Sequence, residues 1–326
     1  MKDMNQPKFR AGQIFAWLCR GADDFDKMTD VPASLKEELA ARGFRTGLLM
    51  PEKVQISALD GTRKYLFVLS DGNAIESVFM KYKYGNTICI SSQAGCRMGC
   101  RFCASTIGGL KRNLTPGEMS EQVMAAERDT GERINHIVIM GTGEPFDNYE
   151  NISSFIRIMT HKSGRNMSMR NITVSTCGIV PFIEKFADDF PQTNLAISLH
   201  APDNELRSSM MPVNKKYPLE ELIPACRRYT RKTSRRITFE YTLVKGVNDT
   251  DSHAVQLAEL LRGMLCHVNL IPLNKVEETG FKTTGRKRAE EFCRILQQNG
   301  IPSTIRRELG DDIDAACGQL RLGRKK

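Results

Sequence analysis

The sequence predicts an α/β fold built on a parallel sheet, and two patterns indicate it. Short apolar runs alternate with stretches of helical periodicity along residues 86–300, as is typical of parallel βαβ units. Polar or glycine residues follow these runs at their carboxyl ends, at the edge where parallel α/β folds build their sites. About six such repeats are compatible with an open barrel or with a wound sheet.

The first 85 residues show a different residue pattern, which predicts two accessory units. Residues 1–48 are expected to form a small helical domain, with one helix over 10–20 and a second over 34–42 that ends at Gly43. Residues 49–85 contain three short strand patterns separated by Asp60-Gly61 and Asp71-Gly72. Because Asp-Gly is a strong hairpin signal, this stretch predicts a β-meander that leads into the main domain.

The main domain is expected to span 86–300 and to be followed by a terminal strand and loop over 301–326. The predicted strands are Ile88–Ile90, Ile137–Met140, Ile172–Val174, Leu195–Leu199, Ile237–Val244 and Val268–Ile271. The predicted helices between and after them are Asn151–His161, Pro181–Phe190, Leu219–Thr230, Ser252–Met264 and Arg286–Gln298.

Composition narrows the class of protein. The 326 residues carry a net charge of +9, which excludes an acidic disordered chain and is compatible with a polyanionic partner. No apolar run of about 18 residues occurs, so no membrane span is expected, and residues 1–7 lack the apolar core of a signal peptide. The ten cysteines then indicate reduced thiols, metal ligands or catalysts in a cytoplasmic protein.

The strongest local signal is the C-x3-C-x2-C motif of Cys96, Cys100 and Cys103, directly after the first predicted parallel strand. Three closely spaced thiolates can hold one soft metal centre. A structural zinc site closes with four ligands, whereas a [4Fe–4S] cluster held by three cysteines keeps one iron open. Zinc with a distant fourth ligand, or buried thiols without a metal, are the alternatives at this point.

With Phe102 before its last cysteine, this motif resembles that of the radical S-adenosylmethionine superfamily. The turn Gly141–Pro145 is similar to the superfamily's contact with the methionine amino group. The resemblance implies a partial (β/α)6 TIM-like barrel and a [4Fe–4S] cluster whose open iron chelates S-adenosylmethionine. One electron from the cluster would then cleave this cofactor to a 5′-deoxyadenosyl radical.

Further strings, spread over essentially the whole chain, resemble the ribosomal-RNA adenine methyltransferases that act at C2, whose relatives act at C8. They are Pro7–Arg10 with Gln13–Phe15, Ser91–Cys96, Met140–Asn148, Ser198–Pro202 and Asp312–Leu320. The resemblance implies methylation at C2 of an adenosine in 23S rRNA and of an adenosine in transfer RNAs. This sequence departs from the family at Thr142, where methionine is common, and in having only residues 1–6 before the first string.

The resemblance also implies residue roles. The cluster ligands would be Cys96, Cys100 and Cys103, and the S-adenosylmethionine contacts would be Gly143, Glu144, Ser175, Ser198, Leu199, His200 and Asn274. Cys317 would become S-methylated, Cys89 would be its disulfide-forming partner, and Glu76 would accept a proton. From local pattern alone, Glu76 would be predicted to be an exposed strand carboxylate and Cys89 an inert strand cysteine.

The implied reaction uses two S-adenosylmethionine molecules in each turnover. The first would methylate Cys317, and the radical from the second would remove hydrogen from that methyl group, so that the resulting carbon radical adds to the base. Cys89 would then attack the Cys317 sulfur, release the methylated RNA and leave a disulfide that must be reduced. We expect a monomer supplied with electrons by a donor such as flavodoxin or ferredoxin.

Other functions remain open from the sequence. A C8-methylating relative that confers antibiotic resistance, a non-catalytic RNA-binding protein with a structural metal, and another radical enzyme such as a methylthiotransferase or an activase are the alternatives. Two interpretations of the basic clusters also remain open: they contact RNA phosphates, or they form solvated helix faces. They include Lys111-Arg112, Lys215-Lys216, Arg227-Arg228, Arg231-Lys232, Arg235-Arg236, Arg286–Arg288, Arg306-Arg307 and Arg324–Lys326.

Overall fold

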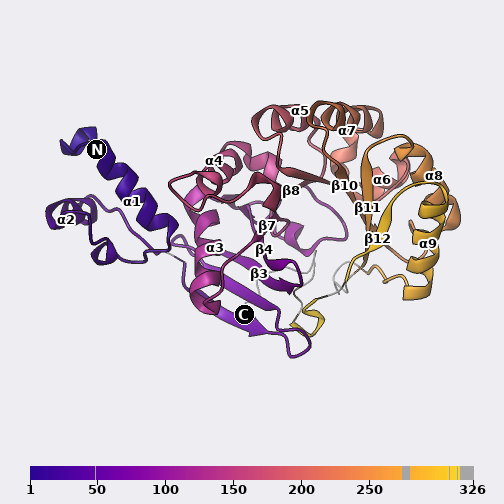
Figure 1. Ribbon diagram of the computed structural model, residues 1–326. Coiled ribbons are helices and arrows are strands. Elements are labelled where there is room, and N and C mark those ends of the chain that lie inside the picture. The colour runs from indigo at the N-terminus through magenta and orange to yellow at the C-terminus, as the bar shows by residue number, and fades with distance from the viewer. Residues whose placement is uncertain (48, 274–279, 308, 314, 316–326) are drawn as a thin grey trace.

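The computed structural model describes residues 1–47, 49–273, 280–307, 309–313 and 315. A mixed sheet of ten strands runs through the molecule in the order β1-β2-β3-β4-β7-β8-β9-β10-β11-β12. Helices cover the outer side of this curved sheet, while α1 and α2 stand apart from it at one end (Figure 1). The predicted α/β class is therefore confirmed.

The N-terminal helices are α1 (Phe9–Cys19) and α2 (Ala33–Ala41), with short 3-10 turns at Lys2–Met4 and Phe25–Lys27. Both helices agree with the predicted ranges to within a residue at each end. They share a small apolar core of their own around Met28, Val31 and Leu35. The indole Nε1 of Trp17 donates a hydrogen bond to Oδ1 of Asp30 (2.5 Å), which ties α1 to the segment before α2.

The predicted β-meander is also confirmed. Strands β1 (Pro51–Ile56), β2 (Arg63–Val68) and β3 (Ala74–Tyr82) pair antiparallel, and β3 pairs antiparallel with β4 (Gly85–Ile90). Gly61 has a φ of +73° and Gly72 a φ of +79°, the left-handed conformation that glycine adopts without strain. The two Asp-Gly pairs therefore mark the turns as predicted.

The parallel part of the sheet begins at β4. It continues through β7 (His136–Ile139), β8 (Ile172–Thr176), β9 (Asn194–Ser198), β10 (Ile237–Leu243), β11 (Cys266–Pro272) and β12 (Ser303–Ile305). All of the predicted parallel strands are present, and β12 lies within 301–326, where a terminal strand was predicted. Among the described residues β1 and β12 form the two edges, so the sheet is open, as in a partial barrel.

The five predicted helices of this part correspond to α4 (Tyr149–Thr160), α5 (Val180–Asp189), α7 (Leu219–Thr233), α8 (Asp251–Leu261) and α9 (Arg286–Gln298). Two further helices were not predicted, α3 (Pro116–Thr130) and α6 (Asn204–Met210). Short pieces complete the chain: β5 (Gln93–Ala94), β6 (Arg112–Asn113), and 3-10 turns at Ala104–Thr106, Pro145–Asn148, Met169–Asn171, Pro212–Lys215 and Asp311–Ile313. The domain boundaries at 48, 85 and 300 stay predictions.

The main core lies between the sheet and its helices. Strand residues such as Ile88, Ile137 and Val174 pack there against helix residues such as Phe155 and Phe186, all with no measurable exposure. Burying one such side chain stabilises the fold by about 1.5–3 kcal/mol. This packing holds the carboxyl ends of the parallel strands at one edge, where the candidate site lies.

Candidate active site

The three motif cysteines lie on one loop, which joins β5 to β6 beyond the carboxyl end of β4. The loop is closed where the amide of Lys111 donates to the carbonyl of Ala94 (2.8 Å). Gly95 has a φ of +74°, and a Cβ atom there would lie 2.0 Å from the carbonyl oxygen of Gly109. Glycine is therefore required for the two arms of the loop to pass so closely.

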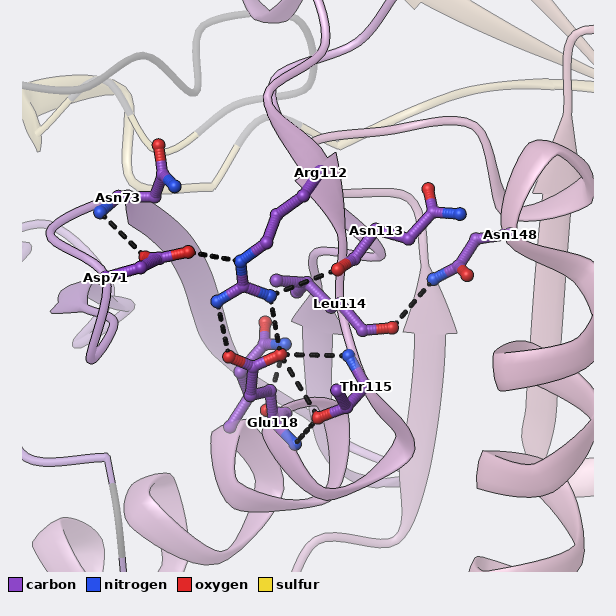
Figure 2. Close-up of polar contacts among 9 residues, drawn as sticks. Asp71, Asn73, Arg112, Asn113, Leu114, Thr115, Glu118 and Asn148 are labelled. Carbon is purple, nitrogen blue, oxygen red and sulfur yellow. Dashed lines mark hydrogen bonds and ion pairs between the residues drawn. The ribbon is translucent and has the colours of Figure 1, made fainter.

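A polar network fixes the strand that closes this loop (Figure 2). Arg112 on β6 donates to both carboxylate oxygens of Glu118 (2.7 and 2.9 Å) and also pairs with Asp71 in the β2–β3 turn. Glu118 in turn accepts the amide of Thr115 (2.9 Å) within the capping box that begins α3. Because bidentate arginine–carboxylate pairs fix geometry strongly, the cysteine loop is attached to both α3 and the β-meander.

The sulfur donors of this loop suit an iron–sulfur cluster. Burial, together with nearby anionic groups, raises the pKa of Cys96 to about 12 and the pKa of Cys100 well above its ordinary value. Such thiols stay protonated at neutral pH until a metal takes them as thiolates. No set of three His, Cys, Asp or Glu residues in the described chain is arranged to hold a single metal ion. In a [4Fe–4S] cluster each cysteine binds a different iron, which requires a wider spacing.

The cysteine loop faces the carboxyl ends of the neighbouring parallel strands across one pocket. Its lining includes Cys96, Cys100, Cys103, Gly143, Glu144, Ser175, Ser198 and His200. The structure thus brings these predicted site residues together, while their roles stay predictions. Leu199 is different, because it is fully buried in the core and is absent from the described lining of this pocket. Asn274 lies outside the described residues.

The turn after β7 is held by Glu144. Its Oε1 accepts the amide of Phe146 (2.9 Å) and its Oε2 accepts the amide of Cys177 (2.7 Å), which joins the ends of β7 and β8. Its own amide donates to Oε1 of Gln93 (2.8 Å). Burial raises the pKa of the Glu144 carboxyl group, although these amides act to lower it. The turn expected to contact the methionine amino group is therefore rigidly positioned.

The other predicted reactive residues lie on one face of β3 and β4. Strand register places Lys64, Val78, Cys89 and Val138 in a row across β2, β3, β4 and β7. Glu76 precedes Val78 by two residues on β3 and so shares its face. The Lys64 Nζ lies 3.7 Å from Oε1 of Glu76, and the two residues are only 8% and 3% exposed. The expectation of an exposed carboxylate at Glu76 was wrong, because neighbouring elements enclose this face.

Residues 309–313 and 315, here called the C-terminal segment, pack on the same face. Figure 1 shows this yellow segment beside the β-meander. Its apolar residues form one cluster with the strand residues: Leu309, Ile313 and Ala315 with Val78, Met80 and Cys89. Two carboxylates attach it to the β1–β2 turn. The Asp60 Oδ2 accepts the amide of Gly310 (3.0 Å), and the Asp312 Oδ2 accepts the amide of Ala58 (2.9 Å). Cys317 lies outside the described residues.

Asp60→Ala is expected to release this segment, because the Gly310 amide loses its acceptor. We expect faster hydrogen exchange at Gly310–Ile313 and a loss of about 1 kcal/mol in unfolding free energy. Hydrogen exchange read by mass spectrometry checks the first effect. Asp71→Ala, at the matching position of the β2–β3 turn, is the control and leaves exchange in the segment unchanged. Unchanged exchange in Asp60→Ala would show that the apolar contacts and the hydrogen bond between Asp312 and Ala58 hold the segment without Asp60.

Comparison with known proteins identifies the family. A family model described as "Radical SAM superfamily" matches residues 90–260, and one described as "Ribosomal RNA large subunit methyltransferase N-terminal domain" matches residues 1–43. A protein of Lachnospira eligens, named "Probable dual-specificity RNA methyltransferase RlmN", is 53% identical over 98% of this chain and 92% of its own length. The chain belongs to the RlmN family of radical S-adenosylmethionine RNA methyltransferases.

Two further proteins support membership in the RlmN family. A protein of Thermoanaerobacter sp. strain X514 with the same printed name is 52% identical over 98% of this chain and 93% of its own length. The crystal structure of a radical SAM methyltransferase from Sphaerobacter thermophilus superposes with a TM-score of 0.93 at 49% identity, covering 98% of this chain and 95% of that one. The superfamily implies a [4Fe–4S] cluster and S-adenosylmethionine. None of the described helices is long and apolar enough to cross a membrane.

Several pocket residues of this RlmN family member were missed in the sequence. Glu240 and Thr242 on β10 line the pocket together with Arg306. Glu240 accepts a hydrogen bond from Nδ2 of Asn269 (2.8 Å), and burial raises the pKa of its carboxyl group while Arg306 lowers it. A charged residue inside a strand whose other residues are uncharged was the signal, because it indicates that one face of the strand meets a polar site.

Some basic clusters that were candidates for RNA contact are engaged within the chain. Arg112 binds two carboxylates, as described above. Ion pairs also join Arg228 to Glu184 and Lys232 to Asp188. The Arg228 and Lys232 side chains are about half exposed, and ion pairs at such surface positions contribute little to stability and exchange readily. Contact with RNA phosphates and solvated faces both stay predictions for these clusters.

His200 is expected to weaken the fold at acid pH. Burial, aided by the charge of Arg207, lowers its pKa to about 3, and its Nδ1 accepts the amide of Thr242 (2.9 Å). Between the folded pKa and the ordinary value of 6.5, the unfolded histidine binds a proton that the folded one does not. The unfolding free energy therefore falls as the pH drops below 6.5, by up to about 1.4 kcal/mol per pH unit.

Urea unfolding between about pH 7 and pH 5 measures this effect. His200→Gln is expected to lose that part of the pH dependence, whereas His136→Gln, on β7 and away from the pocket lining, keeps it. Because His200 lines the pocket that would hold the cluster, the iron content of each protein is measured at each pH, and only samples with equal iron content are compared. Identical slopes for His200→Gln and the parent protein would contradict the prediction.

Proposed function

We propose that this chain methylates C2 of adenosine 2503 in 23S rRNA and of adenosine 37 in transfer RNAs. Membership in the RlmN family supports the reaction class. The observation that carries the proposal is the shared pocket, in which three thiols of one loop face the turn at Gly143 and Glu144 and the strand ends at Ser175 and Ser198. This is the arrangement that a cluster and a cofactor chelated to it require.

Two cofactors would bind in this pocket. When bound, the cluster and S-adenosylmethionine supply the one-electron chemistry and the methyl group. Cys96, Cys100 and Cys103 would hold the cluster. Gly143, Glu144, Ser175, Ser198, His200, Leu199 through its main chain, and Asn274 would hold S-adenosylmethionine. We further propose that two molecules of S-adenosylmethionine are consumed in each turnover.

Cys317, Cys89 and Glu76 would carry out the chemistry on the RNA base. Cys317 would present the methyl carbon and become bonded through it to C2. The resulting radical adduct would lose one electron, for which the oxidised cluster is an acceptor, and Glu76 would take the C2 proton. The Cys89 thiolate would then attack the Cys317 sulfur, so that the sulfur–carbon bond breaks, the methyl carbon takes up a proton, the methylated base leaves and a disulfide forms. Two observations support these roles: Glu76 and Cys89 share one face, and Ala315 packs on it. Cys317 follows Ala315 by two positions in the sequence.

The proposed reaction requires two sources of electrons. The one-electron step requires a reductant such as flavodoxin or ferredoxin, and the disulfide requires a second reduction before the next turnover. We expect the enzyme to act as a monomer in the cytoplasm. The N-terminal unit of residues 1–48 and the β-meander of residues 49–85 would help to bind folded RNA.

Anaerobic reconstitution tests the proposal. The enzyme, with iron and sulfide restored, is incubated with S-adenosylmethionine, a strong reductant and a 23S rRNA fragment or a transfer RNA. Mass spectrometry of the digested RNA should find 2-methyladenosine, and that of the protein should find about one extra methyl group on the Cys317 peptide. An RNA with guanosine at the target position is the control. Finding 8-methyladenosine would overturn the C2 assignment, and finding no methylated base would overturn the function.

A further inference from the structure

Arg207 on α6 is a buried cation for which neither the family assignment nor the proposed mechanism accounts. The residue has no measurable exposure, and it is among the largest fully buried side chains of the described chain. Its guanidinium donates to four neutral acceptors: the carbonyls of Cys177 (2.7 Å), Leu199 (3.2 Å) and Ser198 (3.3 Å), and Oδ1 of Asn214 (2.7 Å). Within the described residues no carboxylate lies within ion-pair distance of it.

Burying a charged guanidinium group lowers the stability of the folded protein unless a negative charge lies nearby. Buried charges are normally paired, because neutral dipoles replace only part of the lost hydration. Arginine keeps its charge inside proteins, so the cost is not avoided by loss of a proton. The guanidinium donates to the carbonyl of Cys177 (2.7 Å), and Cys177 belongs to an apolar cluster against which Cys100 packs. Only the Cys177 residue therefore separates the guanidinium from a predicted cluster ligand.

The helix that carries Arg207 lies against the cysteine loop. The amide of Arg101, within the motif, donates to the carbonyl of Met210 at the end of α6 (3.0 Å). Just beyond α6, Cγ of Pro212 lies 3.4 Å from the position of a Cβ on Gly99. The carbonyls that Arg207 binds belong to the ends of β8 and β9, on the opposite wall of the pocket. Arg207 thus links α6, which lies against the cysteine loop, to the ends of β8 and β9 on the opposite wall of the pocket.

We propose that Arg207 is a positioning residue with two separable effects. Its planar guanidinium group holds in place, through hydrogen bonds, the strand ends that bind S-adenosylmethionine, and its positive charge raises the reduction potential of the cluster. Three thiolates on a [4Fe–4S] core of charge 2+ leave one net negative charge, and one-electron reduction adds a second. A fixed cation nearby stabilises the reduced state more than the oxidised state. This inference rests on the cluster that is proposed for Cys96, Cys100 and Cys103.

Two substitutions separate the effects. Arg207→Lys keeps the positive charge but loses the planar guanidinium group that donates to four acceptors. Arg207→Gln loses both the charge and most of the hydrogen bonds. Arg165→Gln is the matched control, because the Arg165 side chain is also largely enclosed (8% exposed) but pairs with Glu127, away from the pocket lining. Each protein is reconstituted anaerobically, and its iron content and cluster absorption are measured first.

The readouts are the midpoint potential, from a redox titration followed by electron paramagnetic resonance, and the dissociation constant for S-adenosylmethionine. In Arg207→Gln we expect about a tenfold lower ratio of reduced to oxidised cluster at a given potential, which corresponds to a midpoint about 59 mV more negative. Arg207→Lys should keep the parental midpoint. Both variants should bind S-adenosylmethionine about tenfold more weakly, and Arg165→Gln should match the parent in both measurements.

The possible results are distinguishable. If Arg207→Lys shifts the midpoint as far as Arg207→Gln does, or if neither shifts it, Arg207 has no electrostatic effect on the cluster and the inference is overturned. If Arg207→Gln does not fold, a shifted midpoint in Arg207→Lys alone overturns it, and a parental midpoint with weakened cofactor binding supports it. If the parent protein itself fails to assemble a cluster, the proposed function fails, and the inference falls with it.

Discussion

Replacing Cys89 with alanine is expected to leave the enzyme covalently joined to its RNA. Cys89 belongs to the apolar cluster that also contains Leu309, Ile313 and Ala315, so the described chain ends beside it, two residues before Cys317. Without the Cys89 thiol no nucleophile attacks the Cys317 sulfur, and the sulfur–carbon link to the base persists. We expect a protein–RNA species on denaturing gels and a fall in released product of about a hundredfold or more.

Two variants serve as controls for the Cys89 prediction. Cys266→Ala removes another buried strand cysteine, on β11, and should release product as the parent does. Cys317→Ala should neither methylate RNA nor form the adduct, because it lacks the atom that carries the methyl group. Adduct formation by Cys317→Ala, or normal product release by Cys89→Ala, would contradict the assigned roles.

Gly143→Ala is expected to abolish binding of S-adenosylmethionine while the cluster loop keeps its iron. Gly143 has a φ of +112°, and a Cβ atom there would lie 2.6 Å from Cβ of Gln93 and 2.7 Å from Oγ of Ser92. These neighbours stand beside the strand that closes the cysteine loop and cannot easily move. The turn must shift instead, which breaks the bond between the Glu144 amide and Gln93.

Equilibrium dialysis with labelled S-adenosylmethionine measures this effect. We expect the dissociation constant to rise about a hundredfold, equivalent to about 2.7 kcal/mol. Gly12→Ala is the control, because its added Cβ would have no heavy atom within 4 Å and the residue lies within α1. Iron content should stay at the parental level in both variants. Parental affinity in Gly143→Ala would show that the turn at Gly143 does not seat the cofactor.

Most of the fold was predictable because its signals are local. Apolar runs such as Ile137–Met140 and turn pairs such as Asp60-Gly61 depend on neighbouring residues, and the structure places strands and turns there. The helix α3 was missed although Thr115 and Glu118 form a capping box with Pro116 in the first turn, a signal that is also local.

The sequence by itself determined the strand–helix alternation, the cysteine loop and the edge of the sheet where the site lies, because each depends on residues close together in the chain. Only the tertiary structure decided that Glu76 is buried beside Lys64, that Arg207 lies fully enclosed behind the pocket, and that Glu240 lines it. Period-two alternation shows which strand residues share a face, but not which distant segment covers that face. The face of β3 is covered in part by residues around Ile313, more than 200 positions later, and no local pattern carries that information.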